Sequence, residues 1–170
     1  MSCILNTGFT LGCNTIGGIE SVWIGTWDSA TAWTLGTQSD ITGVTAANTV
    51  YLYEQDIEFA GLEQTGQFSR ENGTVFFESV LSVKFIELDN DLRNTIIALA
   101  KAPLYAVIKS NAGHFYVLGV ESAGRATEGV ASLGVAQGDM NGANLSFTFK
   151  SPNGAFLMDG SLIGTSITVG

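Results

Sequence analysis

Three carboxylates occupy alternate positions of one short segment, at Glu54, Asp56 and Glu58. Alternate residues of an extended strand point to the same face of a sheet. Paired carboxylates can catalyse glycoside hydrolysis or bind calcium, but a catalytic pair needs surroundings that separate the two pKa values. Three like charges with Glu63 nearby are more typical of a solvated strand face. We therefore expect a solvent-exposed strand face. A more specific hypothesis is that this face is a surface that repels a polyanion.

The other residue types that support catalysis are sparse. His114 is the single histidine, and its position after a turn-forming cluster indicates an exposed turn residue. The sequence has no Gly-x-Ser-x-Gly motif, no phosphate-binding loop, and too few cysteines and histidines for a zinc site. Asp139 lies in a glycine-flanked loop but lacks the other spaced ligands of a calcium site. We expect no enzymatic activity, no cofactor and no metal.

The two cysteines, Cys3 and Cys13, lie close to the N-terminus. They are too few for a disulfide framework, although the two thiols could form one bond. Leu11-Gly12-Cys13 resembles the end of a lipobox, but the residues before it include no Lys or Arg and no continuous apolar stretch. Because a secretory signal needs both features, we expect free thiols in a reducing compartment.

Composition favours one globular domain with an unusual surface. The 170 residues suit a single domain, and 45% hydrophobic residues exclude a disordered chain. No apolar run approaches the ~20 residues of a membrane-spanning helix, and the net charge of −9 argues against a nucleic-acid-binding surface. Only 14% of the residues are charged, against about 25% in typical domains. Because a monomer normally needs a charged surface, we expect other copies or partners to cover much of this one.

Alternating and β-branched segments predict a mainly β fold. The expected strands are 19–27, 50–59, 62–69, 74–86, 104–109, 114–121 and 143–150, with a further strand at 161–169. We interpret 28–49 as loop with one short strand near Ile41, and the glycine-rich segment 122–142 as a long loop that could include one short strand. Both faces of 74–86 carry apolar residues, so we expect both to be covered for part of the strand's length.

One helix is expected at about 89–101. Asp89 or Asn90 can cap its start, apolar residues recur at helical spacing from Leu92 to Leu99, and Pro103 ends it. The predicted architecture is a β-sandwich or barrel with this amphipathic helix packed on it, in one domain over 1–170.

A polar turn is expected between the strands 62–69 and 74–86. It comprises Arg70, Glu71, Asn72, Gly73 and Thr74, and its Asn-Gly pair is a hairpin signal. Such a turn can be an ordinary exposed loop, or an arm that docks on a neighbouring subunit.

Several of these segments together resemble the major tail or tail-tube proteins of tailed bacteriophages, especially phages of Bacteroidetes-type hosts. The resemblance covers about residues 11–150. It is carried by Cys13 with Gly17-Gly18-Ile19, by Arg70 to Thr74 leading into Phe76-Phe77-Glu78, by His114 to Glu121, by the glycine-rich 124–142, and by Leu145 to Phe149. Residues 151–170 do not match the pattern.

The resemblance implies a β-sandwich of tail-tube type with one flanking helix, and rings of subunits that are commonly hexameric. Stacked rings would form the tail tube of the virion, through which genomic DNA passes without specific binding during ejection. Residues 1–18 would form an N-terminal arm, 151–170 a C-terminal extension, and the turn at 70–74 a contact between rings. The partners would be further copies and other tail proteins, with assembly in the bacterial host cytoplasm and no membrane.

Under this interpretation Glu54, Asp56 and Glu58 are the candidates for facing the lumen, because a negative wall does not hold phosphates. A second hypothesis is another virion part with a related fold, such as a tail terminator, a tail-completion ring or a capsid decoration protein. A third is a carbohydrate-binding β-sandwich with tryptophan platforms. Trp23 and Trp27 fall on one strand face, however, so core or interface packing is the favoured use for them.

Overall fold

The computed structural model describes residues 16–170 except 57, 88, 137 and 140. Cys3, Cys13 and most of the expected N-terminal arm lie outside the described residues. The elements are β1 (Ile19–Thr26), β2 (Ala32–Leu35), β3 (Ile41–Thr45), β4 (Val50–Glu54), β5 (Gly61–Ser69), β6 (Thr74–Ile86), α1 (Asn90–Lys101), β7 (Leu104–Ser110), β8 (Phe115–Leu118), β9 (Arg125–Ser132), β10 (Gly142–Ser151), β11 (Phe156–Met158) and the 3₁₀ turn η1 (Gly160–Leu162).

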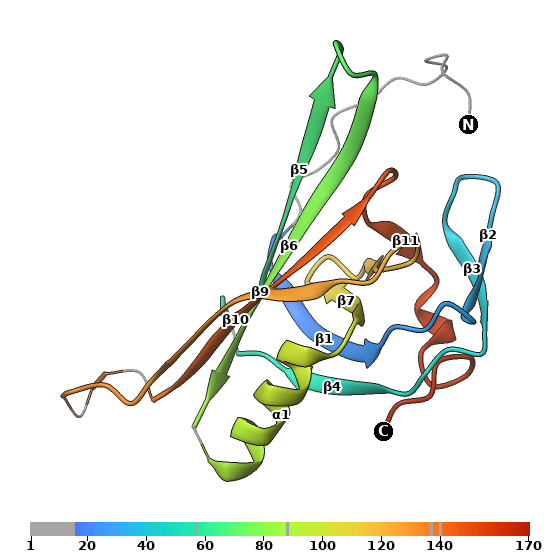
Figure 1. The fold of residues 1–170 in the computed structure, drawn as a ribbon. Coiled ribbons are helices and arrows are strands. Elements are labelled where there is room, and N and C mark those ends of the chain that lie inside the picture. The colour runs from blue at the N-terminus through green and yellow to red at the C-terminus, as the bar shows by residue number, and fades with distance from the viewer. Residues whose placement is uncertain (1–15, 57, 88, 137, 140) are drawn as a thin grey trace.

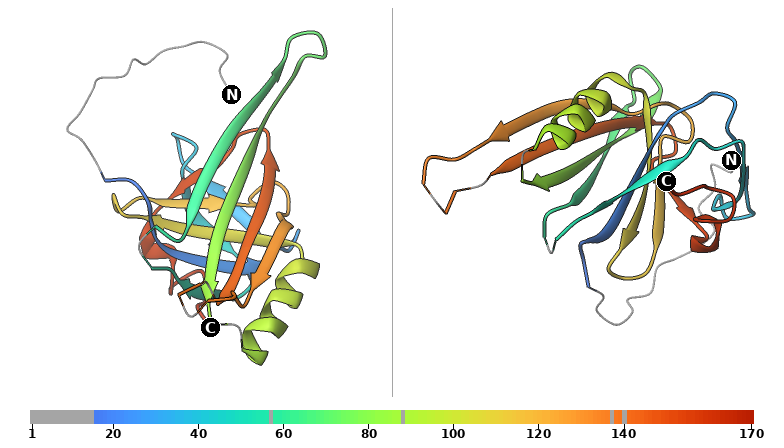
Figure 2. Two further views of the ribbon diagram at one scale, coloured as in Figure 1. Left: turned by 90° about the vertical axis from the view of Figure 1, so that its left-hand side faces the viewer. Right: turned by 90° about the horizontal axis from the view of Figure 1, so that it is seen from below.

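The strands form two sheets that pack face to face (Figures 1 and 2). The larger sheet has the order β2-β3-β11-β8-β7-β1-β4, and the smaller sheet has the order β5-β6-β10-β9. Every pair in the smaller sheet is antiparallel. In the left view of Figure 2 its strands cross those of the larger sheet at a large angle. The mainly β class is therefore confirmed, and among the described strands neither sheet closes into a barrel.

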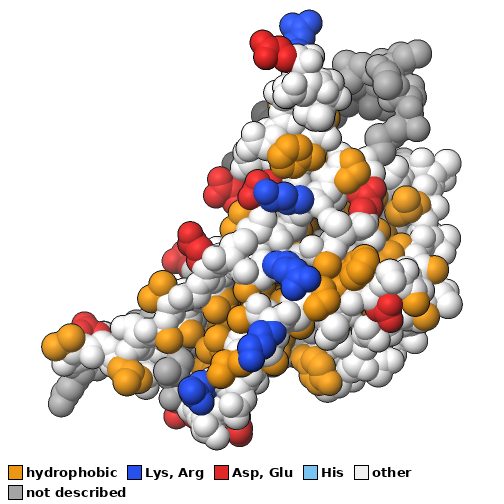
Figure 3. Space-filling view, in the orientation of Figure 1, with side chains coloured by type: hydrophobic (Ala, Val, Ile, Leu, Met, Phe, Trp, Pro, Cys, Tyr) orange, Lys and Arg blue, Asp and Glu red, His pale blue; other side chains and the backbone are white. Residues whose placement is uncertain are grey.

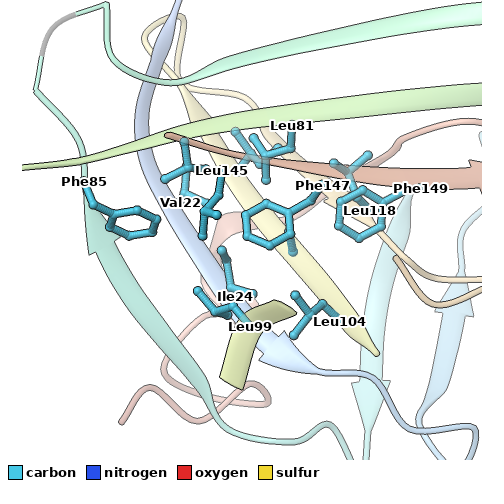
Figure 4. Close-up of a cluster of buried hydrophobic side chains, with 13 residues drawn as sticks. Val22, Ile24, Leu81, Phe85, Leu99, Leu104, Leu118, Leu145, Phe147 and Phe149 are labelled. Carbon is cyan, nitrogen blue, oxygen red and sulfur yellow. The ribbon is translucent and has the colours of Figure 1, made fainter. Parts of the chain in front are cut away.

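The main core lies between the two sheets (Figure 4). Alternate residues of β6 and β10 point into it, and Leu81 and Phe147 are 0% and 1% exposed. The larger sheet contributes residues of β1, β7 and β8, and α1 adds Leu99. Each such side chain contributes about 1.5–3 kcal/mol by leaving water, so this layer holds the sheets together.

The opposite face of the larger sheet holds a second core cluster. It includes Ile41 of β3, Val50 of β4, and Tyr105 and Val107 of β7. Because β3 and β4 lie near opposite ends of the sheet order, the sheet curls around this cluster. Burial raises the pKa of Tyr105 to about 12, and the Tyr105 hydroxyl donates a hydrogen bond to the Asn48 carbonyl oxygen at 2.5 Å.

The helix α1 lies where its capping residues predict it. The Asp89 side chain accepts a hydrogen bond from the Leu92 backbone N–H at 2.7 Å, which satisfies one free donor of the first turn. After the helix, Ala102 is extended, as the residue before a proline prefers to be. The expected helix is confirmed. The described residues contain no helix that is both long and apolar enough to cross a membrane.

Three segments differ from the prediction. The segment 28–49 forms two strands, β2 and β3, where one short strand was expected. The glycine-rich segment 122–142 contains β9, which has eight residues and lies at an edge of the smaller sheet. Residues 161–169 form no strand and contribute only part of η1 and isolated bridges, one of which joins Val169 to Val50. Within 151–170, β11 lies inside the larger sheet, so this segment is part of the fold.

Replacing Phe147 by Ala should lower the free energy of unfolding by about 3–5 kcal/mol, because it leaves a cavity between the sheets. Phe68→Ala is the matched control, since Phe68 is 70% exposed and should contribute about 1 kcal/mol through its edge contact with Phe77. Denaturant unfolding followed by tryptophan fluorescence measures both. Equal losses in the two variants would contradict the assignment of the main core.

Candidate functional site

The smaller sheet ends in two strands that pair on one side only. Among the described strands, β5 pairs with β6 alone and β9 pairs with β10 alone. Residues 63–65 of β5 and 127–131 of β9 are exposed. The helix α1 packs beside β9 (Figure 2), and Ile96 and Ala100 of the helix line a groove together with residues 126–131, of which 127–131 nevertheless stay exposed. Both edges therefore present backbone N–H and C=O groups that a further strand can pair with.

The outer face of the smaller sheet, which is turned away from the larger sheet, is mixed in character. It carries the residues of β6 and β10 that alternate with the core positions, among them Glu78, Lys84 and Lys150. Glu78 and Lys150 form an ion pair at 3.6 Å that remains partly exposed and contributes little to stability. We expected both faces of β6 to be covered for part of its length. In the single chain only the inner face is buried, and the residues of the outer face are half-buried or exposed.

Two further carboxylates lie on the outer face, close to its free edges. Glu63 of β5 is in register with Val80, and Glu128 of β9 is in register with Ser146. Val80 and Ser146 alternate with the buried residues of their strands, so Glu63 and Glu128 point to the outer face as well. Sequence patterning did not single out this face, because it allowed only a short strand of undefined bounds within 122–142.

Glu54, Asp56 and Glu58 do not share a strand face. β4 ends at Glu54, and the chain then turns, with Glu58 at a φ of 65°. The Gln55 side chain accepts a hydrogen bond from the Lys84 backbone N–H at 3.1 Å, which ties the segment to β6. Glu54 and Asp56 line a groove beside α1, whereas Glu58 lines a depression over the outer face. The expected period-two arrangement is therefore wrong, although all three side chains are exposed.

The expected hairpin at 70–74 is confirmed. Ser69 pairs with Thr74, and Gly73 takes a φ of 63°, a conformation that glycine adopts without strain. The hairpin extends beyond the core (Figure 1), and we call its outer part, residues 66–77, the arm. Phe68 and Val75 on the arm are 70% and 56% exposed. The role of the turn as a contact between subunits stays a prediction.

A second hairpin, formed by β9 and β10, ends in an apolar tip that sequence analysis missed. It projects from the other end of the smaller sheet, and Leu133 and Val135 are exposed there (Figures 1 and 3). The Asp139 carboxylate accepts hydrogen bonds from the backbone N–H groups of Val135 and Ala136, both at 2.8 Å. These bonds hold the pKa of the Asp139 carboxyl below its ordinary value. Asp139 thus orders a hairpin loop.

The remaining chemistry-bearing residues are dispersed. His114 is exposed and follows the turn between β7 and β8, as expected. In the part of the chain that the structure describes, no group of three or more His, Cys, Asp or Glu side chains could hold a metal ion. No family model, curated protein or solved structure matches the chain. The inference of function therefore depends on the free edges, the outer face and the two projecting hairpins.

Asp139→Ala should abolish the protection of the Val135 and Ala136 amides against hydrogen exchange, because both lose their acceptor. In the wild type, the stabilisation that the ionised Asp139 carboxylate gives the folded state is fully present above its unfolded-state pKa of about 3.9. It is lost as the pH falls through the lower pKa that Asp139 has in the folded state. Amide exchange measured by NMR tests this. Asp28→Ala, which removes the acceptor of the Ala30 amide, is the control and should leave the tip unchanged. Unaltered protection in Asp139→Ala would show that the carboxylate does not order the tip.

Proposed function

We propose that this protein is a structural subunit of a bacteriophage tail tube, which assembles into rings that stack into a conduit for DNA. The observation that carries the proposal is the smaller sheet with its two free edges. The segments that resemble tail-tube proteins support it, since 70–78 includes the turn of the arm and its β6 strand, and 145–149 forms the centre of β10. The low charge content, 14% of residues, agrees with a surface that other copies cover.

The strand directions allow the two edges to join between copies. Four consecutive antiparallel strands make β5 and β9 run in opposite directions. When copies in the same orientation stand side by side, β5 of one and β9 of the next are therefore antiparallel and extend one continuous sheet. Their lengths also match, at nine and eight residues. Such a contact joins two different surfaces, so it closes into a ring when the rotation per subunit allows.

A ring formed in this way has the outer face of the smaller sheet as one of its two surfaces. We assign that surface to the lumen, because the exposed carboxylates Glu63 and Glu128 lie on it. On the same surface Glu78 is paired with Lys150, and the Lys84 ammonium lies over the Phe59 ring. With a net charge of −9 per chain, a ring repels DNA and lets it slide. Of the three carboxylates first considered, Glu58 lies over this face, and Glu54 and Asp56 lie beside α1.

The fold argues against the glycan-binding alternative, because the tryptophans that would stack on a sugar are used in packing. Trp23, Trp27 and Trp33 are half-buried and pack against the second core cluster. Trp23 stacks on Phe115 at 6.3 Å between ring centroids, and Trp33 meets Tyr105 edge-on at 5.8 Å. These contacts use the ring faces and edges that would otherwise bind a sugar. A terminator or completion ring remains the second candidate, because it would use the same free edges and stop at one ring.

Negative-stain electron microscopy of concentrated protein should show open-ended tubes with a regular axial repeat. Proline substitutions at Val130 and Ala131 test the edge contact, because N–H groups of neighbouring strand residues point to opposite sides. One of the two variants loses a bond to β10 and is destabilised. The other loses only an outward donor, so it should unfold like the wild type and form no rings.

Wild-type rings that never stack would favour the terminator or completion ring. If both proline variants form rings as readily as the wild type, the β5–β9 contact is wrong.

Charge reversal tests the assignment of the lumen. Tubes of Glu63→Lys with Glu128→Lys should hold short duplex DNA inside and protect it from nuclease, with a retention that falls as salt rises. The matched control is Glu54→Lys with Glu87→Lys, which adds the same charge beside α1 and should give no protection. Protection by the control variant alone would place the lumen on the side of Glu54.

A further inference from the structure

We propose that the apolar tip of the β9–β10 hairpin docks into a groove at the base of the arm of a second copy in the next ring. The inference rests on the proposed function and names the contact that stacks one ring on another. We call Leu133 and Val135 the tip. The arm groove is the depression whose lining includes Val75 and Phe77 of β6, Phe156 and Leu157 of β11, and residues of the loops 38–40 and 152–155.

The tip displays apolar side chains on an ordered loop. Leu133 is 72% exposed and Val135 is fully exposed. Gly134 takes a φ of 69°, and a Cβ there would lie 2.4 Å from the Asp139 Cβ, so the loop closes tightly around that carboxylate. Because the backbone of Val135 and Ala136 is already held by the Asp139 carboxylate, covering the tip costs less conformational entropy than covering a free segment. The two aliphatic side chains are therefore available for another molecule to cover.

The arm groove offers an apolar receptor of suitable size. Its volume is about 530 Å³, and its apolar walls remain accessible, with Val75 and Leu157 56% and 48% exposed. Polar residues, among them Asp40 and Asn153, line it together with the apolar ones. A mixture of apolar and polar residues is the usual composition of a protein–protein contact.

The two features lie at opposite ends of the same strand pair. Gly142 of β10 is in register with Ile86, next to the tip, and Ser151 is in register with Phe77, beside the groove. β10 has ten residues, so roughly 30 Å separate its ends. The tip therefore cannot reach the groove of its own chain and must find it on another copy.

A shift along the strand direction brings the tip of one copy to the groove of the next. This contact joins two different surfaces and is not closed by rotation, so it repeats without limit. The β5–β9 contact acts sideways within a ring, and the tip–groove contact acts along the tube axis. The arm of the copy that carries the groove extends past the docked tip. The turn at 70–74 would therefore lie between the two rings.

A charge exchange across the contact tests this inference. Val135→Glu alone and Leu157→Lys alone should each shorten the tubes about tenfold or more while leaving single rings, because each places an unpaired charge in an apolar contact. The two substitutions combined in one chain should restore much of the length, since the new charges then meet between copies. Ile97→Glu on α1 is the control and should stack like the wild type. Electron microscopy and light scattering measure rings and tubes separately.

Tubes of wild-type length in Val135→Glu would overturn the docking contact and leave the proposed function intact. Shortening by Val135→Glu without shortening by Leu157→Lys would overturn the groove as the receptor. The absence of rings in the wild type and in every variant would instead overturn the proposed function, and the stacking contact with it.

Discussion

The pairing of β6 with β10, packed by one face against the larger sheet, is the interaction on which the rest of the structure depends. Leu81 and Val83 of β6 and Phe147 and Phe149 of β10 point to the same side and fill the main core. A slip of one residue in either strand would turn these side chains to the outer face. The register of the centre is therefore fixed by burial, and the positions of β5 and β9 follow from it.

The same pair is longer than the core that it covers. β6 has 13 residues, and its buried side chains lie between Ser79 and Phe85. The residues before Ser79 leave the core and form the arm, and at the other end β9 and β10 continue into the apolar tip. The two projections are thus the uncovered ends of strands whose middle is buried. This explains why apolar residues such as Phe68 and Leu133 are exposed without any defect in the packing.

The elements that could be predicted from the sequence were those with a strong local signal or one clearly buried face. The helix α1 was predicted from Asp89 and Pro103, and β6 and β10 from their alternation, because these signals are local or reflect one buried face. The bounds of β9 were not predicted, and 122–142 was expected to hold a short strand at most. The residues of β9 are mostly exposed and include Gly129, so no alternation marks it. The prediction that Glu54, Asp56 and Glu58 share a strand face was wrong. After Glu54 the chain turns and is tied to β6 by a long-range hydrogen bond from the Lys84 N–H to the Gln55 side chain, and sequence periodicity carries no information about that bond.

The two sheets differ in how their edges are protected, and this difference favours assembly through the smaller one. In the larger sheet β2 has only four residues, and β4 is met by the C-terminal segment at the Val50–Val169 bridge. Short strands and covering segments are common protections against edge pairing, as are lysine and proline on the edge. β5 and β9 are longer, contain neither lysine nor proline, and remain exposed. Since a monomer would gain solubility from protecting these edges, their exposure agrees with the proposal that strands of other copies complete the sheet.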